Sequence, residues 1–528
     1  MPGRPPHGAP MTANEAFAPP SGLEETSLRL IPHVLRPLPP LAQEMFEAFM
    51  LAFGGRAVHI NGYTFLGGGT GQPAVALDPP PSNDGREAWE QHALPRVREI
   101  CEGLWSEDYG PWPIEELAQA LPGYVAEAAR GFAYTMQPLM IIAAPASALM
   151  VFCGEKLQSM GDRDRLVAAL VQGVDNESAA RGLKLEALAP LAQASPALLE
   201  AVGAGDLAAA QAAEGGAAFG EAFDAYLEDY GHGSQTWWEL HTPTWREEPT
   251  AALRLLAGYV ADPSRAPVAA HTRSAAERAE TIARCEAALS DDGDQERFGA
   301  LVEGAADYVF VIEGRAHWQQ NCVGALRPAC LALGSKLTAA GALANPEDVF
   351  HLRLAELAPL AANPSGAMLE TIEERKAELA SWAGLAPPLL LGPPPPPPPA
   401  DGPPNPIALM FGGPPKPSDD PMLLNGKGAS RGVVTGRARV VFSLEEAETL
   451  EPGDILVCPF TAPSWMPVFT TAAAIVTNQG GVLSHAAIEA REYGIPCVTG
   501  TASGTQRIPD GATVTVDGEA GTVRIHGD

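Results

Sequence analysis

One stretch near the C-terminus decides the fold of that part of the chain: Gly480-Gly481-Val482-Leu483-Ser484-His485-Ala486-Ala487-Ile488-Glu489. The two glycines predict a turn, and the residues from His485 to Tyr493 predict a helix that stops at Gly494-Ile495-Pro496. Short apolar runs at 473–476 and 497–499 predict a strand on each side. The pattern indicates strand, glycine turn, helix and strand, with one histidine delivered to the start of the helix.

A histidine at this position suits phosphoryl transfer. Ser484 is a plausible N-cap for a helix that begins at His485, and Gly480 and Gly481 allow the backbone to approach a ligand closely. Free backbone N–H groups and the positive end of the helix dipole attract an anion. Because the dipole also disfavours imidazolium, we expect His485 to be neutral and nucleophilic near pH 7. A lone histidine at a helix start is more often structural, and the surrounding string is what favours catalysis.

About the last hundred residues resemble the phosphohistidine, or swivelling, domain of the phosphoenolpyruvate-utilising enzyme family. That family includes pyruvate phosphate dikinase, phosphoenolpyruvate synthase and rifampicin phosphotransferase. Besides the histidine stretch, the resemblance rests on Gly432–Ala438, Asp454–Pro467 and Asp510–Val523, in the family's order. It implies an α/β fold for this part of the chain.

The resemblance also implies the site residues. It makes His485 the phosphorylated residue, accompanied by Ser484, Gly480 and Gly481. Arg491 is either a phosphate partner or a charge on the helix surface. Plant-type dikinases carry a regulatory threonine two residues before the histidine; here Leu483 occupies that position, so we expect no regulation by that route.

Composition limits the remaining possibilities. A chain of 528 residues predicts roughly two to four domains. Lysine and arginine number 34 against 64 acidic residues, a net charge of −30 that disfavours nucleic acid or an anionic membrane as partner. Seven cysteines without a Cys-x-x-Cys pair predict neither a disulfide framework nor a metal site and suit the cytoplasm.

The sequence predicts a multidomain protein, with a mainly α-helical N-terminal domain and a C-terminal α/β swivelling phosphohistidine domain. We expect a disordered arm at 1–24, a helical domain at 25–385, a Pro/Gly-rich linker at 386–426 and the phosphohistidine domain at 427–528. Prolines 393–399 predict a stiff rod of about 22 Å on which that domain swings. A passive spacer, or a ligand for a proline-binding module, is the alternative.

The helical part contains strings that resemble the substrate-binding domain of rifampicin phosphotransferase and its relatives. They are Val58–Tyr63, Tyr230–His232, Thr244–Pro249 and Leu333–Leu352. The region 265–340 predicts two or more long helices, interrupted near 291–294.

Six residues of this part are candidates for substrate binding. His232 and Trp237 either line a pocket or belong to a helix-end turn with core tryptophans. Glu313 and His317 share a helical face, so His317 is either a base oriented by Glu313 or half of a surface salt bridge. Arg246 and Arg327 are either phosphate clamps or partners of acidic residues. A third zinc ligand is missing near Glu313 and His317, so no metal is predicted.

We expect a phosphotransferase component, of kinase or dikinase type. No nucleotide-binding loop and no ATP-grasp pattern are recognisable, whereas full-length relatives begin with an ATP-grasp domain. The resemblance therefore implies an ATP-grasp partner in trans that uses Mg²⁺ and ATP, no tightly bound cofactor, and a small hydroxyl or enolate acceptor. One alternative is a non-catalytic or regulatory binding protein. Another is phosphorylation that activates the acceptor for elimination or carboxylation.

Overall fold

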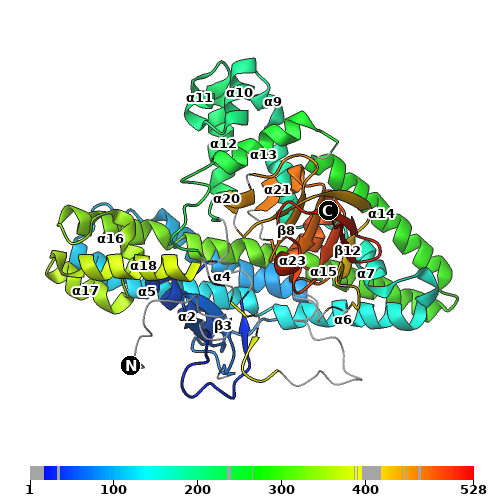
Figure 1. Cartoon of the computed structure of the whole chain (residues 1–528), viewed down its shortest axis with the longest axis horizontal. Helices are drawn as coiled ribbons and strands as arrows, with labels where there is room; N and C mark the ends of the chain where they lie inside the picture. Colours follow the sequence, from blue (N-terminus) through cyan, green and yellow to red (C-terminus); the bar gives the residue numbers. More distant parts are fainter. Residues whose placement is uncertain are drawn as a thin grey trace. The chain divides into compact units, whose positions relative to one another are not determined.

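Helices predominate in the structure, a computed structural model (Figure 1). It describes residues 17–31, 36–69, 71–234, 239–264, 266–383, 385, 387–388, 390–394, 415, 418–442, 444–447, 449–461 and 465–527. The chain forms two units, which we describe separately. The first consists of the described residues of Met1–Ala76, Ser106–Ala133 and Leu326–Pro397, and the second of those of Leu77–Trp105, Tyr134–Ala325 and Pro398–Asp528.

The first unit contains a small antiparallel sheet. Its strands are β1 (Leu28–Leu30), β2 (Ala57–Ile60), β3 (Tyr63–Leu66) and β4 (Leu390–Leu391), in the order β2-β3-β1-β4. Asn61 and Gly62, at φ 51° and 75°, form the tight turn between β2 and β3, because this hairpin turn needs two residues with positive φ. The string Val58–Tyr63 therefore forms a hairpin.

The helices of the first unit pack closely where a glycine allows it. They are α2 (Pro40–Ala52), most of α5 (Ile114–Met136), α16 (Arg327–Ala339), η3 (Pro346–His351), α17 (Leu354–Ala362), η4 (Gly366–Met368) and α18 (Leu369–Ala383). At Gly334 of α16, a Cβ atom would lie 2.0 Å from the carbonyl oxygen of Pro346 in η3. A side chain at this position would force the two elements apart.

The second unit is built on long helices. Its helices before the sheet are α3 (Gly85–Glu87), η1 (Ala88–Ala93), α4 (Leu94–Ser106), α6 (Leu139–Lys156), α7 (Arg163–Val171), α8 (Glu177–Glu186), α9 (Ala189–Ala192), α10 (Pro196–Ala204), α11 (Leu207–Ala212), α12 (Gly216–Tyr230), α13 (Thr250–Ala261), α14 (Pro267–Ala288) and α15 (Asp292–Gly324). The Asp291 side chain caps α15 by accepting from the Asp294 N–H. The predicted break between two long helices is thereby confirmed.

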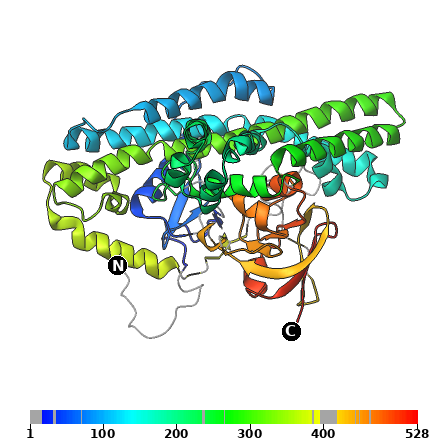
Figure 2. The same cartoon turned by 90° about the horizontal axis from the view of Figure 1, so that it is seen from above.

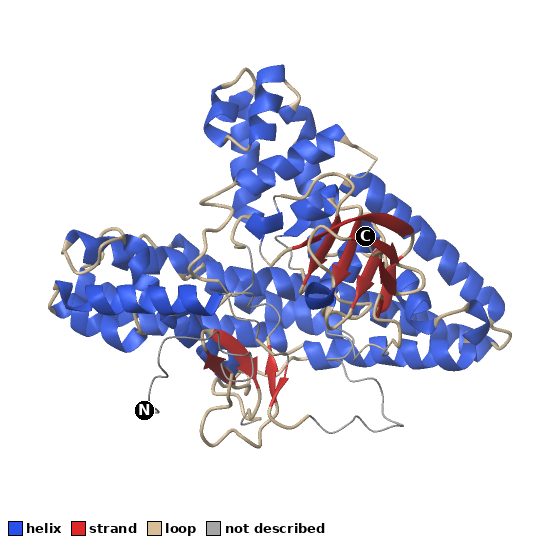
Figure 3. Ribbon diagram, in the orientation of Figure 1, coloured by secondary structure: helices blue, strands red, loops and turns tan. Residues whose placement is uncertain are grey.

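An eight-stranded sheet follows in the second unit. Its strands are β5 (Leu423–Asn425), β6 (Lys427–Ser430), β7 (Val433–Val440), β8 (Ile455–Cys458), β9 (Ala474–Thr477), β10 (Cys497–Thr499), β11 (Thr513–Asp517) and β12 (Thr522–Ile525), in the order β5-β12-β11-β7-β8-β9-β10-β6. Figure 3 shows the strands of the chain gathered in two separate sheets. The predicted combination of a helical region and a C-terminal α/β region is confirmed.

Parallel pairing within this sheet fixes the place of the histidine helix. Strands β7, β8, β9 and β10 run parallel, and α22 (His485–Glu492) connects β9 to β10. The other helices of this part are α20 (Leu444–Ala447), α21 (Met466–Thr471) and α23 (Gly504–Arg507). In Figure 2 the strands of the eight-stranded sheet, yellow-orange to red, lie beside the green helices of residues 250–324. There α13 contacts α21, and α14 contacts α22.

The units do not follow the boundaries predicted from the sequence. Described residues of the predicted arm are packed: Phe17 and Leu23 are 2% and 7% exposed and lie in one cluster with Tyr63. Residues 17–24 thus include packed positions rather than a disordered arm. The helical part divides between both units. Most of the proline run 393–399 lies outside the described residues, so the rod and its swinging motion stay predictions.

One helical stretch, Ile114–Lys156, is long and apolar enough to cross a membrane by length and composition alone. Half of its most apolar window (53%) is buried inside the protein, as in the core helix of a folded domain. Its α6 portion packs along α15, with the rings of Phe152 and Phe298 centred 6.0 Å apart. The packing explains the apolar composition of α6 without a membrane.

We predict that Gly334→Ala destabilises the protein, although Gly→Ala inside a helix ordinarily stabilises it by up to ~1 kcal/mol. The new methyl group meets the Pro346 carbonyl oxygen, and the displacement of η3 should cost about 1–3 kcal/mol. Gly123→Ala on α5 is the matched control, because nothing lies within 4 Å of its added Cβ. Urea denaturation measures both variants, and equal or higher stability of Gly334→Ala would show that the two elements do not pack this closely.

Candidate active site

The glycine turn holds a histidine at the first position of α22, as predicted. Gly480 has φ +129°, and a Cβ there would lie 2.8 Å from the Ser484 hydroxyl, so the turn needs a glycine. The Ser484 N–H donates to the carbonyl oxygen of Gly481 at 3.1 Å. Ser484 occupies the N-cap position with extended backbone, but its buried hydroxyl has no hydrogen-bond partner among the described residues. The predicted N-cap position is confirmed, but the Ser484 side chain makes no capping hydrogen bond.

Arg491 supports this turn from behind. Its Nη1 donates to the carbonyl oxygens of Val482 at 2.8 Å and Ala429 at 3.1 Å. The side chain is buried, and burial lowers its pKa to about 10, so it remains charged at neutral pH. Arg491 is therefore neither a helix-surface charge nor, in this arrangement, a contact of His485. It fixes the backbone that carries the histidine.

His485 faces two carboxylates. Its Nδ1 lies 3.3 Å from Oε2 of Glu313 on α15 and 4.0 Å from Oε1 of Glu489, one turn further along α22. All three side chains are buried, with 8%, 3% and 4% of their surface exposed. The Ser178 hydroxyl donates to the same Glu313 oxygen at 2.6 Å. Nε2 of His485 is buried and has no hydrogen-bond partner among the described residues, so it is the ring nitrogen that no protein group occupies.

The helix dipole does not set the pKa of His485 in this arrangement. Burial by itself lowers its pKa, but the charge and hydrogen bond of Glu313, with the charge of Glu489, raise the pKa above its ordinary value. The pKa of Glu313 stays low despite burial, because His485, Ser178 and Arg181 stabilise its charge. Burial raises the pKa of Glu489 to about 7. A charged carboxylate in contact outweighs the helix dipole.

The same three side chains could also hold a cation. One ligand atom from each of Glu313, His485 and Glu489 lies within 4.8 Å of the others. Three ligands from nitrogen and oxygen are what a catalytic zinc ion takes from a protein. The absence of a metal site therefore remains a prediction.

Further contacts hold α22 against the helices of the second unit. The hydroxyls of Tyr493 and Tyr259 on α13 are 2.7 Å apart and buried. Glu492 accepts from the Gly173 N–H at 2.9 Å and lies 3.3 Å from His271 on α14. α22 and its C-cap are therefore held by contacts from α13, α14 and α15, and the position of His485 over α15 rests on several interactions.

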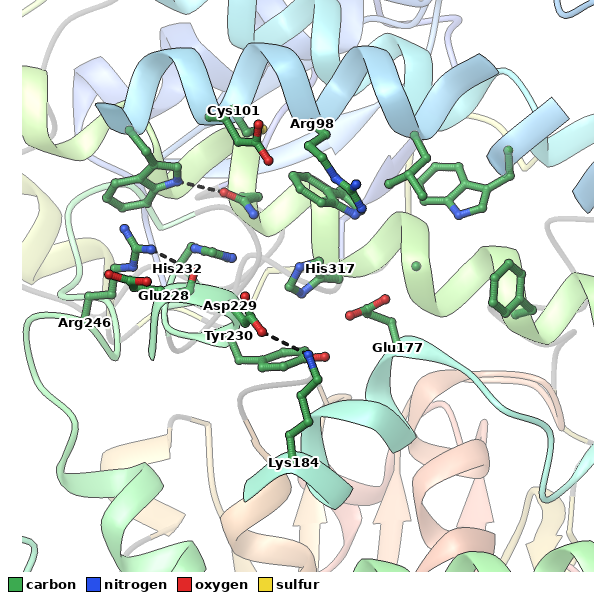
Figure 4. Close-up of a pocket in the computed structure, with 18 residues that line it drawn as sticks. Arg98, Cys101, Glu177, Lys184, Glu228, Asp229, Tyr230, His232, Arg246 and His317 are labelled. Carbon is green, nitrogen blue, oxygen red and sulfur yellow. Dashed lines mark hydrogen bonds and ion pairs between the residues drawn. The ribbon is translucent and has the colours of Figure 1, made fainter. Parts of the chain in front are cut away.

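An aromatic cavity of about 370 Å³ lies in the same unit (Figure 4). Its aromatic and imidazole walls are Trp89, Trp105, Tyr230, His232, Phe310, His317 and Trp318; its charged residues are Arg98, Glu102, Glu177, Lys184, Glu228, Asp229 and Arg246. Lys184 is paired with Asp229 at 2.9 Å. The cavity combines flat apolar surfaces with polar groups, as sites for small organic molecules do.

Both imidazoles of the cavity are neutral at pH 7. Burial lowers the pKa of His232 to about 3 and that of His317 well below its ordinary value. Nδ1 of His317 lies 3.4 Å from Nη2 of Arg181, and because guanidinium cannot accept, Nδ1 must be the acceptor. The proton of His317 therefore sits on Nε2, where it is a donor.

This corrects the predicted roles of Glu313 and His317. Both are buried, so they form no surface salt bridge. Glu313 bonds to Ser178 and His485 rather than orienting His317, and His317 with its proton on Nε2 is a hydrogen-bond donor rather than a base.

The remaining predicted residues are divided between the units. His232 and Arg246 line the cavity, where Arg246 donates to the carbonyl oxygens of Leu227 and Glu228 and stacks 4.5 Å from the ring centre of Trp105. Arg327 belongs to the first unit and pairs with Glu347 at 3.3 Å. Trp237 lies outside the described residues.

Sequence reasoning missed three residues of the site. Glu489 is four residues after His485 in a predicted helix, and that spacing was a usable signal. Glu177 lines the cavity from the first turn of α8. Arg181, one turn after Glu177 on α8, contacts His317. No pattern in the sequence around Arg181 indicates this contact.

Two parts of the chain match known families. Residues 450–521 match the mobile domain of the PEP-utilising enzymes, and residues 136–311 match the fourth domain of rifampicin phosphotransferase. The chain carries a PEP-utiliser domain. We use this name for residues 423–525, which include the eight-stranded sheet and α22. The resemblance predicted from the sequence is confirmed.

Individual relatives agree with this assignment. The chain is 33% identical over 385 residues to chondramide synthase cmdD of Chondromyces crocatus, covering 68% of the chain and 10% of the relative. It is 31% identical over 378 residues to rifampicin phosphotransferase of a Streptomyces species, covering 69% and 42%. The uncharacterized phosphotransferase YvkC of Bacillus subtilis is 48% identical over 100 residues, covering 19% and 12%.

The chain thus spans less than half the length of these relatives. Its matched parts are of phosphotransferase type. Glu313 and His317 lie just beyond the segment that matches the fourth domain.

We predict that His485 titrates above the ordinary histidine pKa of about 6.5 and that Glu313→Gln lowers its pKa. The pairing with Glu313 therefore stabilises the protein fully below about pH 6.5, as long as Glu313 stays charged, and is lost as the pH rises through the higher folded-state pKa of His485. Heteronuclear NMR of ¹⁵N-histidine-labelled protein measures the titration. Asp175→Asn is the control, because Asp175 contacts His271 and not His485. An unchanged His485 pKa in Glu313→Gln would contradict the contact.

Proposed function

We propose that this chain is a phosphotransferase in which His485 carries a phosphoryl group to an organic acceptor held in the aromatic cavity. The supporting observation is the contact of His485 with Glu313 on α15. Glu313 and His317 are four residues apart, about 6 Å along the helix axis, and His317 lines the cavity. The carrier nitrogen and the acceptor cavity are thus supported by adjacent turns of one helix.

Glu313 selects the nitrogen that reacts. It accepts the Nδ1 proton, so that Nε2 takes the phosphoryl group. A phosphorylated imidazole that keeps its proton on Nδ1 leaves as neutral imidazole, which is a better leaving group than an imidazolate anion. The negative charges of Glu313 and Glu489, which raise the pKa of the unmodified ring, also favour a proton on Nδ1 of the phosphorylated ring. Docking on Glu313 therefore favours discharge.

The transfer step exchanges one bond to phosphorus for another. The acceptor oxygen attacks phosphorus, the P–Nε2 bond breaks, and its electron pair returns to Nε2. The proton of the acceptor hydroxyl passes to a carboxylate, for which we propose Glu177, a half-buried acid that lines the cavity. The Nε2–H of His317 orients the acceptor.

The walls of the cavity favour a planar acceptor. Trp89, Trp105, Phe310 and Trp318 line the cavity, and pairs of aromatic rings contribute about 0.5–1.5 kcal/mol beyond burial. A volume of about 370 Å³ lies within the range of small-molecule sites. We propose an aromatic hydroxyl or an enolate as the acceptor class.

The phosphoryl donor is ATP with Mg²⁺, bound by an ATP-grasp unit that lies either in a separate protein or elsewhere in the same polypeptide. We propose that the protein acts in the cytoplasm and that no cofactor stays bound to this chain. These features follow the family resemblance.

We predict that His485 takes up phosphate from ATP in the presence of the nucleotide-binding unit, or from phosphoramidate without it. His485→Ala should lose the acid-labile, alkali-stable modification completely, because no other nitrogen replaces Nε2. Intact-mass and peptide mass spectrometry measure the modification, and 1-naphthol serves as the first acceptor in a chase. His271→Ala is the control, because His271 contacts α22 without belonging to the carrier site. Equal phosphorylation of His485→Ala would remove the carrier from the mechanism.

A further inference from the structure

A second cavity in the same unit gathers positive charge. It has a volume of about 220 Å³ and lies between α7 and α14 on one side and the PEP-utiliser domain on the other. Four arginines line it: Arg165 on α7, Arg273 on α14, Arg431 after β6, and Arg491 on α22. We call it the arginine pocket. It is separate from the aromatic cavity, and the two share no lining residue.

The positive charge of the arginine pocket is not neutralised by the residues around it. Glu277 is the one acid among its lining residues, and it already accepts from the Gln172 amide at 3.1 Å. Within the described part of the chain, the guanidinium groups of Arg165, Arg273 and Arg431 make no hydrogen bond or ion pair. The chain has nearly twice as many acidic as basic residues, 64 against 34, so unpaired arginines are unexpected.

Acidic residues next to the arginine pocket are engaged elsewhere. Asp164, beside Arg165 in sequence, pairs with Lys427 at 2.9 Å and with Arg163 at 2.7 Å. Glu492, beside Arg491, accepts from the Gly173 N–H and contacts His271. Rotation of a nearby carboxylate into the pocket would break these pairs. An external anion completes the charge balance without that loss.

Arg491 adds a buried donor to the pocket's wall. Its side chain is 8% exposed, and its Nε has no hydrogen-bond partner among the described residues, although Nη1 has two. A buried donor left unpaired costs about 1–3 kcal/mol. Gly494, at φ +65° after α22, brings the backbone so close to Arg273 that a Cβ would lie 3.2 Å from its Nη2.

We propose that the arginine pocket binds a small phosphate-type oxyanion, either orthophosphate or pyrophosphate. Guanidinium groups present paired N–H donors that match the oxygens of a phosphate. The volume lies below the range of about 300–1,000 Å³ typical of sites for larger organic ligands, which favours an inorganic anion over a whole nucleotide.

The bound anion would link two parts of the protein. Arg165 and Arg273 belong to the helices, whereas Arg431 and Arg491 belong to the PEP-utiliser domain. An anion between them replaces repulsion with attraction, so it stabilises the arrangement in which His485 meets Glu313. The site therefore regulates how the carrier docks, and its existence does not depend on the proposed phosphotransfer.

The test is isothermal titration calorimetry of the full chain with orthophosphate, pyrophosphate and AMP, at constant ionic strength set with chloride. We expect saturable binding of orthophosphate or pyrophosphate that is weakened at least ~10-fold in Arg273→Gln and in Arg431→Gln, because each removes a charge-assisted hydrogen bond. Both arginines are exposed, so folding should survive. The anion should also raise the melting temperature of the wild type by mass action, and less so in the variants.

Arg284→Gln is the matched control, since Arg284 is an exposed arginine on the same helix that does not line the pocket. AMP binding as tightly as orthophosphate would show that the pocket takes the phosphate of a nucleotide and would overturn its assignment to an inorganic anion. Absence of saturable binding by all three anions, or an equal loss of affinity in Arg284→Gln, would overturn the proposal.

Discussion

The structure of the second unit depends on one buried contact, that of His485 with Glu313. Removing a carboxylate and an imidazole from water costs several kcal/mol per charge, and only a close partner of opposite charge offsets that cost. Glu313 is 3% exposed and His485 is 8% exposed, so neither has water as an alternative partner in this arrangement. The contact therefore favours the position of the PEP-utiliser domain on α15 in which His485 meets Glu313. Tyr259 on α13 and His271 on α14 reinforce that position through Tyr493 and Glu492 at the end of α22.

This constraint gives the site a direction. Nδ1 is occupied by carboxylates, Nε2 is free, and the next turn of α15 carries His317 into the aromatic cavity. A neutral histidine at a helix start is suited to receive a phosphoryl group. A phosphohistidine that is protonated on Nδ1 is suited to give the phosphoryl group away. Glu313 comes from the helical part, so the protonation state of His485 depends on docking. In the proposed cycle, His485 therefore has a different electrostatic environment when it gives the phosphoryl group away, docked on Glu313, than when it receives the group.

The local features of this site were predictable, and its partners were not. The glycine turn, the strands around it and His485 at the first helical position follow from short-range patterns within 473–499. Glu313 lies 172 residues away in sequence, and periodicity placed it on a helix without indicating what it faces. The same limit explains why His317 was predicted as a base: its proton is fixed by Arg181, which local sequence does not connect to it. The hairpin at Asn61-Gly62 and the break before α15 were encoded locally, whereas the division into two units arises from long-range packing.

The most direct test of the account is the position of phosphate on the ring of His485. Two-dimensional ³¹P–¹⁵N correlation NMR of the phosphorylated, ¹⁵N-histidine-labelled protein identifies which nitrogen is bonded to phosphorus. The account predicts phosphorus on Nε2 and a proton on Nδ1, because Glu313 and Glu489 face Nδ1. Phosphorus on Nδ1 would contradict it, since a phosphoryl group cannot occupy the space and charge environment of those two carboxylates.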